Sequence, residues 1–134
     1  MPNLKDLEQI GSRAFYRPMA AVELEQAMRL GAAAIRAARD LGLSDMLIDT
    51  TGLTGLGPLG AFQRYEVGSM FATAAGAQFS VAVLARAELI DPQKIGMLVA
   101  QNRNAMIDIF SVEKDAIAWL DSRLRRMNAI RKRQ

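Results

Sequence analysis

Residues 46–60 read MLIDTTGLTGLGPLG and form the most informative segment of the chain. The first part, 46–50, is an apolar run with Asp49 near its end, which is typical of a buried strand. It leads into an uncharged loop that contains four glycines. Loops that contact ligands in α/β domains lie at such strand ends. The segment therefore favours an α/β fold and a binding role for this loop.

Strands and helices are predicted to alternate along the whole chain. The clearest buried strand is 79–85, FSVAVLA, a β-rich apolar run between Gly76 and Arg86. Asp91 and Pro92 are predicted to open a helix, because Asp is a good N-cap and Pro fits the first helical position. The predicted strands cover 13–19, 46–50, 79–85 and 105–110; the predicted helices cover 22–41, 60–75, 92–102 and a last segment after Ser111, with Val112, Ala116, Trp119, Leu120 and Leu124 facing inward. This alternation implies a mainly parallel or mixed sheet with crossover helices.

The composition is that of a single soluble domain over 1–134, with a net charge of +3. The charge is unevenly distributed, because residues 121–134 alone carry a net charge of +5 and the rest of the chain is mildly acidic. Such a tail could contact nucleic acid or anionic lipid, but a solvated basic helix end is the simpler interpretation, and a nucleic-acid partner is not expected. The first residues, MPNLKDLEQIG, do not resemble a secretory signal, and no uncharged stretch reads as a membrane span. We therefore expect a cytoplasmic protein.

The residue types that usually carry catalysis are scarce. The chain has no histidine and no cysteine, so a metal site would need carboxylates alone, and the sequence contains no such cluster. Gly55, Gly57 and Gly60 match the spacing of a dinucleotide-binding loop, yet residues 51–54 separate them from the strand they should follow directly. No pair of carboxylates has the placement typical of acid–base catalysis. The sequence therefore predicts no enzyme activity, no metal and no cofactor.

Several segments together are similar to a known family. These segments are AFYRP at 14–18, MLIDTTGLTG at 46–55, RYE at 64–66, VAVLARAELIDPQKIGMLVAQNRN at 81–104 and IFSVEKDAIAWL at 109–120. Their order and spacing resemble the SpoIIAA-like branch of the STAS-like superfamily, named for sulfate transporters and anti-sigma-factor antagonists. The resemblance implies a four- or five-stranded mixed sheet with helices mostly on one face. It also implies a binding module, either docking on a kinase or holding a lipid-like ligand between helices that can part.

Two threonines are candidates for a phosphorylation switch. The resemblance implies a switch of the form DSSG just ahead of a helix, and residues 49–52 of this chain read DTTG. By position this stretch ends a strand, while the next helix starts near 58–61, where no hydroxyl is present. If that register is correct, the switch is absent. If it is wrong, Thr50 or Thr51 is the candidate.

The helix at 60–75 carries more apolar residues than one buried face requires. The surplus must pack against the core, a second subunit or a hydrophobic ligand, and Met is a flexible filler suited to any of these. Arg64 could lie at the mouth of a groove and pair with an anionic headgroup, or be an ordinary surface arginine near Glu66. The candidate ligand-binding residues are Phe62, Arg64, Tyr65, Val67, Met70, Phe71, Met97 and Leu98.

The sequence thus leads to two functional hypotheses. The first is a non-enzymatic module that holds an apolar or amphipathic small molecule or lipid between the helices at 60–75 and 92–102, with peripheral contact to a membrane surface as an extension. The alternative is a regulatory module that docks on a protein partner or forms a homodimer, with or without phosphorylation of a threonine.

Overall fold

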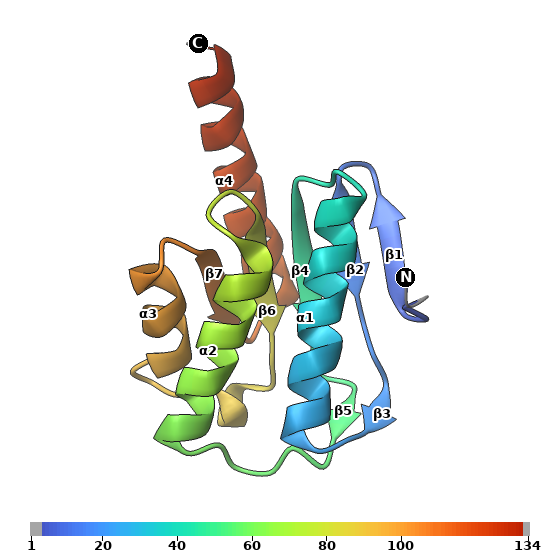
Figure 1. Cartoon of the computed structure of the whole chain (residues 1–134), viewed down its shortest axis with the longest axis vertical. Coiled ribbons are helices and arrows are strands. Elements are labelled where there is room, and N and C mark those ends of the chain that lie inside the picture. Colours follow the sequence, from blue (N-terminus) through green and yellow to red (C-terminus); the bar gives the residue numbers. More distant parts are fainter. Residues whose placement is uncertain (1–3, 133–134) are drawn as a thin grey trace.

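The computed structural model describes residues 4–132, and its centre is a five-stranded sheet in the order β1-β2-β4-β6-β7 (Figure 1). Strand β1 is antiparallel to β2, and the other neighbours are parallel. The prediction of an α/β fold with a mixed sheet is therefore confirmed. The elements are β1 (Leu7–Ile10), β2 (Arg13–Tyr16), β3 (Ala20–Ala21), α1 (Leu24–Asp40), β4 (Asp45–Asp49), β5 (Leu53–Thr54), α2 (Ala61–Ala75), β6 (Ser80–Leu84), the short 3-10 helix η1 (Ala87–Leu89), α3 (Ile95–Asn102), β7 (Met106–Phe110) and α4 (Glu113–Lys132).

Helices cover both faces of the sheet, three on one side and one on the other. In β4, Met46 and Ile48 belong to the core beneath α1, α2 and α3, whereas Leu47 packs with Ala116 and Leu120 of α4. Successive side chains of a strand point to opposite faces, so a strand buried on both sides must be apolar at every position. This requirement explains the continuous apolar run that the sequence shows here.

The predicted boundaries differ from the structure at several points. The strand predicted over 13–19 ends already at Tyr16 as β2. The short strands β1, β3 and β5 were not predicted. Helix α3 begins at Ile95 and not at residue 92, because the Asp91 side chain accepts hydrogen bonds from the amides of Gln93 and Ile95 (both 3.2 Å) and forms a turn before the helix. Val112 was predicted to face inward, but its side chain is 49% exposed and precedes the first turn of α4.

A buried ion pair joins the starts of β2 and β4. The Arg13 Nε and Nη2 atoms donate to the two carboxylate oxygens of Asp45 at 2.8 and 3.0 Å, and Arg13 Nη1 contacts Asp121 of α4 at 2.9 Å. Asp45 is only 2% exposed. The hydrogen bonds that Arg13 donates to Asp45 and Asp121 outweigh the effect of burial and raise the pKa of Arg13. This cluster therefore ties two strands and α4 together through ion pairs.

Helices α2 and α3 approach each other through two glycines. A Cβ atom placed on Gly68 would lie 2.0 Å from the carbonyl oxygen of Gly96, and one on Gly96 would lie 2.8 Å from the carbonyl oxygen of Arg64. No side chain fits between the two backbones at this point. The pair α2–α3 is thus held together by direct backbone packing.

Helix α4 extends beyond the sheet at the end where the parallel strands begin (Figure 1). Its last part carries most of the basic tail predicted from the sequence, and Arg125, Arg126, Arg131 and Lys132 are exposed there. Among the helices described over 4–132, none is long and apolar enough to cross a membrane.

Candidate functional site

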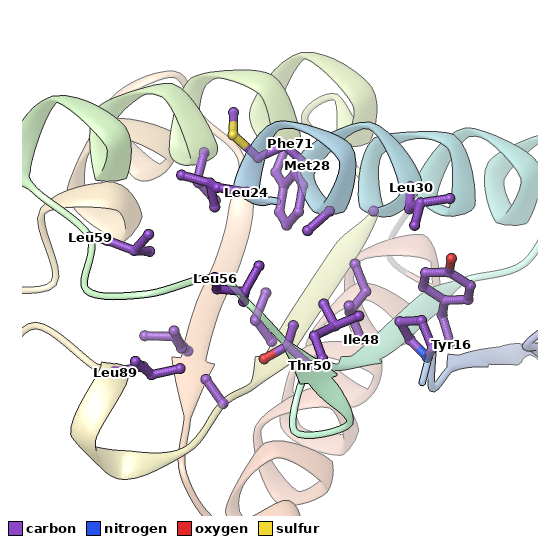
Figure 2. A pocket seen from close by; sticks show the side chains of 18 residues that line it. Tyr16, Leu24, Met28, Leu30, Ile48, Thr50, Leu56, Leu59, Phe71 and Leu89 are labelled. Carbon is purple, nitrogen blue, oxygen red and sulfur yellow. The ribbon is translucent and has the colours of Figure 1, made fainter. Parts of the chain in front are cut away.

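An apolar cavity lies at the carboxyl ends of the parallel strands, beneath α1 and α2 (Figure 2). Its volume is about 110 Å³. The labelled side chains in Figure 2 converge from the helices on one side and from the strands and loops on the other. The lining residues are Tyr16, Pro18, Leu24, Ala27, Met28, Leu30, Gly31, Ile48, Thr50, Leu53, Leu56, Leu59, Val67, Phe71, Val83, Ala85, Leu89 and Ile109.

The uncharged loop over residues 51–60, here called the glycine-rich loop, covers one side of this cavity. It is anchored at its start by the short pairing of β3 with β5 and by the amide of Val22, which donates to the carbonyl oxygen of Thr54 at 2.9 Å. Gly55 and Gly57 then adopt φ values of +88° and +64°, which glycine takes without steric cost. The side chains of Leu56 and Leu59 line the cavity, while the glycines on either side of Leu56 and the residue that precedes Leu59 are exposed. The loop therefore acts as an apolar cover.

A glycine on α1 shapes the inner wall of the cavity. The ring of Phe71 packs directly on Gly31, because a Cβ atom there would lie only 2.6 Å from the ring carbon Cζ. Met28 lies one turn earlier on α1 and also lines the space. The wall offers few polar groups, and the Thr50 hydroxyl already donates to the carbonyl oxygen of Leu84 at 2.8 Å. Such a surface suits apolar atoms of a ligand.

A second, smaller cavity of about 70 Å³ adjoins the first between α2 and the start of α3. Leu59, Val67, Leu89 and Ile109 line both spaces. The second cavity differs in that charged side chains join its wall. These are Arg64, Asp91 and Lys94.

The eight candidate residues on the two helices fall into two groups. Val67 lines both cavities, Phe71 lines the larger one, and Arg64 and Met97 line the smaller one, while Met70 packs against the core as a half-buried side chain. The other three lie on exposed surfaces: Phe62 at 74%, Tyr65 at 46% and Leu98 at 52% exposure. The structure thus brings part of the predicted set together and leaves the aromatic pair of α2 outside.

The contribution of α1 to the site was missed. The larger cavity lies between α1 and α2, whereas the sequence hypothesis placed a groove between α2 and α3. Leu24, Met28 and Gly31 lie within the helix predicted over 22–41, and an amphipathic helix gives no sign that its buried face meets a cavity. Leu56 and Leu59 could have been found, since large apolar residues among glycines in an uncharged loop need somewhere to be buried.

Asp49 holds the turn in which the two candidate threonines lie. Its Oδ1 atom accepts from the amide (2.9 Å) and the hydroxyl (2.6 Å) of Thr51, and its Oδ2 atom accepts from Arg17 at 3.0 Å. Burial raises the pKa of Asp49, but the bonds from Thr51 and Arg17 outweigh it and leave the pKa below its ordinary value. Thr51 is exposed, and α2 begins only at Ala61. Neither threonine therefore stands at a helix start.

We expect the Thr51→Val variant to lose stability only where Asp49 is ionised. Because the pKa of Asp49 is depressed by folding, its carboxylate contributes stability above the unfolded pKa, and this is lost as the pH falls through the folded pKa. Urea unfolding should show a loss of less than about 1 kcal/mol near neutral pH that vanishes in strong acid. Thr54→Val, at an exposed threonine of β5, is the control. A loss that is equal at both pH values would contradict this role.

Within residues 4–132, no group of three or more His, Cys, Asp or Glu side chains is placed to hold a metal ion. The two cavities at this end of the sheet can enclose the apolar atoms of a ligand, and the side chains of Arg64 and Lys94 provide positive charge beside them.

Comparison with known proteins yields no match, neither with a family model, nor with a curated protein, nor with a solved structure. The similarity to SpoIIAA-like domains therefore stays a prediction from the sequence.

Proposed function

We propose that this protein is a non-enzymatic binding module that encloses an apolar or amphipathic small molecule between α1, α2 and the glycine-rich loop. The observation that carries the proposal is the cavity of about 110 Å³ at the carboxyl ends of the parallel strands. In open α/β sheets this end is where ligands bind. The apolar wall and its loop cover support a hydrophobic occupant, and the resemblance to SpoIIAA-like domains is consistent with one.

The cavity size limits the occupant. An engineered apolar cavity of about 150 Å³ in another protein binds benzene, whereas sites for drug-sized ligands span about 300–1,000 Å³. The space here therefore suits a ring or a short aliphatic chain, and a whole lipid would require α1 and α2 to separate. Transport of a whole lipid in the cell would extend the proposal and would depend on that separation of the helices.

Native mass spectrometry of the protein purified from cells tests the proposal without a guess at the ligand. We expect an added mass of up to a few hundred daltons that disappears on denaturation. A dimer without added mass would instead support the alternative, a protein-docking module. The observation that supports this alternative is the exposure of three large apolar side chains, Phe62, Tyr65 and Leu98, on helices α2 and α3, which pack against each other. A mass increase equal to phosphate that survives denaturation would support a switch at Thr50 or Thr51.

We expect Ala27→Leu to reduce binding of a cavity ligand such as 1-octanol by about tenfold or more. The added carbons would occupy space that the ligand needs, and burial of two methylenes alone is worth about tenfold in affinity. Ala37→Leu is the matched control, since Ala37 is also half-buried on α1 but does not line the cavity. Isothermal titration calorimetry measures both variants. Equal affinity of the two variants would contradict the proposed location.

A further inference from the structure

Arg64 is the charged group with the greatest capacity to bind a ligand at the paired cavities. Its Nε atom donates to the carbonyl oxygen of Leu59 at 3.2 Å, and Nη1 donates to that of Leu89 at 3.3 Å. Both bonds are long, and within residues 4–132 the Nη2 amino group makes no hydrogen bond. Among the same residues no carboxylate forms an ion pair with Arg64.

The other two charges at the smaller cavity are already satisfied. Lys94 Nζ is 3.1 Å from the carboxylate of Asp108 and donates to the carbonyl oxygen of Ile109 at 3.2 Å. The two oxygens of Asp91 accept from the amides of Gln93 and Ile95. The cavity thus contains a half-buried arginine with spare donors. The carboxylate in the same wall, that of Asp91, accepts from backbone amides and forms no ion pair with it.

The apolar part of a ligand can lie next to this cation. Leu59 and Val67 line both cavities, so an aliphatic chain in the larger cavity can extend into the smaller one, where Arg64 lies. Volumes of about 110 and 70 Å³ accommodate about six to eight carbon atoms by comparison with the benzene cavity. A guanidinium binds a carboxylate with charge-assisted hydrogen bonds.

We infer that the ligand is a short aliphatic carboxylate, with its chain between α1 and α2 and its carboxylate on Arg64. This inference rests on the proposed function and names the ligand class of the same site. Arg64 itself connects the glycine-rich loop and η1 to α2, because it donates to the carbonyl oxygens of Leu59 and Leu89, and a carboxylate would bind to the donors that these bonds leave free.

The test compares octanoate, 1-octanol and octylamine by isothermal titration calorimetry at neutral pH. We expect octanoate to bind about tenfold more tightly than octanol, and octylamine to bind most weakly. Arg64→Gln should remove the preference for octanoate while octanol binding remains. Arg64→Lys should retain most of the preference. Arg126→Gln, at an exposed arginine on the far end of α4, should change nothing.

The outcomes separate this inference from the proposed function. Equal affinity for octanoate and octanol in the unaltered protein would overturn the carboxylate while leaving an apolar site in place. Loss of octanol binding along with octanoate in Arg64→Gln would also overturn it, because Arg64 would then only support the loop. Absence of binding by all three compounds would overturn both the inference and the proposed function.

Discussion

Gly68→Ala is expected to destabilise the protein by about 3 kcal/mol or more. Elsewhere in a helix, replacement of glycine by alanine stabilises by up to about 1 kcal/mol, since alanine is the better helix former. Here the new Cβ atom would lie 2.0 Å from the carbonyl oxygen of Gly96. That atom belongs to the backbone of α3 and cannot rotate away, so α2 and α3 must separate. Overpacking of this kind costs about 1–3 kcal/mol, and more where the backbone itself must move.

Gly60→Ala is the matched control on the same helix. Gly60 is the N-cap of α2, and a Cβ atom there would meet only the flexible end of Gln63 at 3.7 Å. Its cost should stay below about 1 kcal/mol, because only a modest capping preference is lost. Urea unfolding followed by circular dichroism measures both variants. If Gly68→Ala is as stable as Gly60→Ala, the two helices do not pack backbone to backbone.

Arg13→Met is expected to cost about 3–5 kcal/mol. Asp45 is 2% exposed and accepts two hydrogen bonds from Arg13, so removal of the guanidinium leaves a buried carboxylate without its partner. Loss of one member of a buried pair is far more costly than loss of an exposed pair. Asp121 of α4 would also lose its contact with Arg13. Urea unfolding followed by circular dichroism measures this loss of stability.

Two further variants show whether the buried charge is the cause. Arg29→Met breaks the exposed pair with Glu25 on α1 and should cost no more than about 0.5 kcal/mol. The double variant Arg13→Met with Asp45→Leu should recover much of the stability, because an apolar pair replaces the charges. If Arg13→Met is as mild as Arg29→Met, Asp45 must be reached by water in solution and the pair contributes little.

The central part of the fold was predictable because its strands are buried on both faces. Short continuous apolar runs between turn residues, as at β4 and β6, are typical of such strands. The helices between them follow from the crossover rule. Strand β1 was not predictable in the same way. It is a four-residue edge strand whose last three residues are exposed, so its sequence carries no apolar pattern. Its position depends on pairing with β2, which is a tertiary contact.

The site was predictable in part from α2, from Met97 of α3 and from the loop after β4, but not from α1. The apolar surplus of α2 predicted a packing surface for Val67 and Phe71 beyond one buried face, and both residues line the larger cavity. The same surplus included Phe62 and Tyr65, which lie on the solvent side. Nothing in the pattern distinguishes an apolar residue that lines a cavity from one that is exposed. That difference is set by the packing of α1 against α2, where Phe71 packs on Gly31.

The most direct test of the account is a methyl NMR titration of the protein with 1-octanol. We predict saturable shifts at the methyl groups that line the larger cavity, such as those of Ile48, Leu56 and Val83. The methyl groups of Leu120 on the α4 face of the sheet should not move. Shifts confined to exposed residues such as Leu98, or no saturable shifts at all, would contradict a ligand site between α1 and α2.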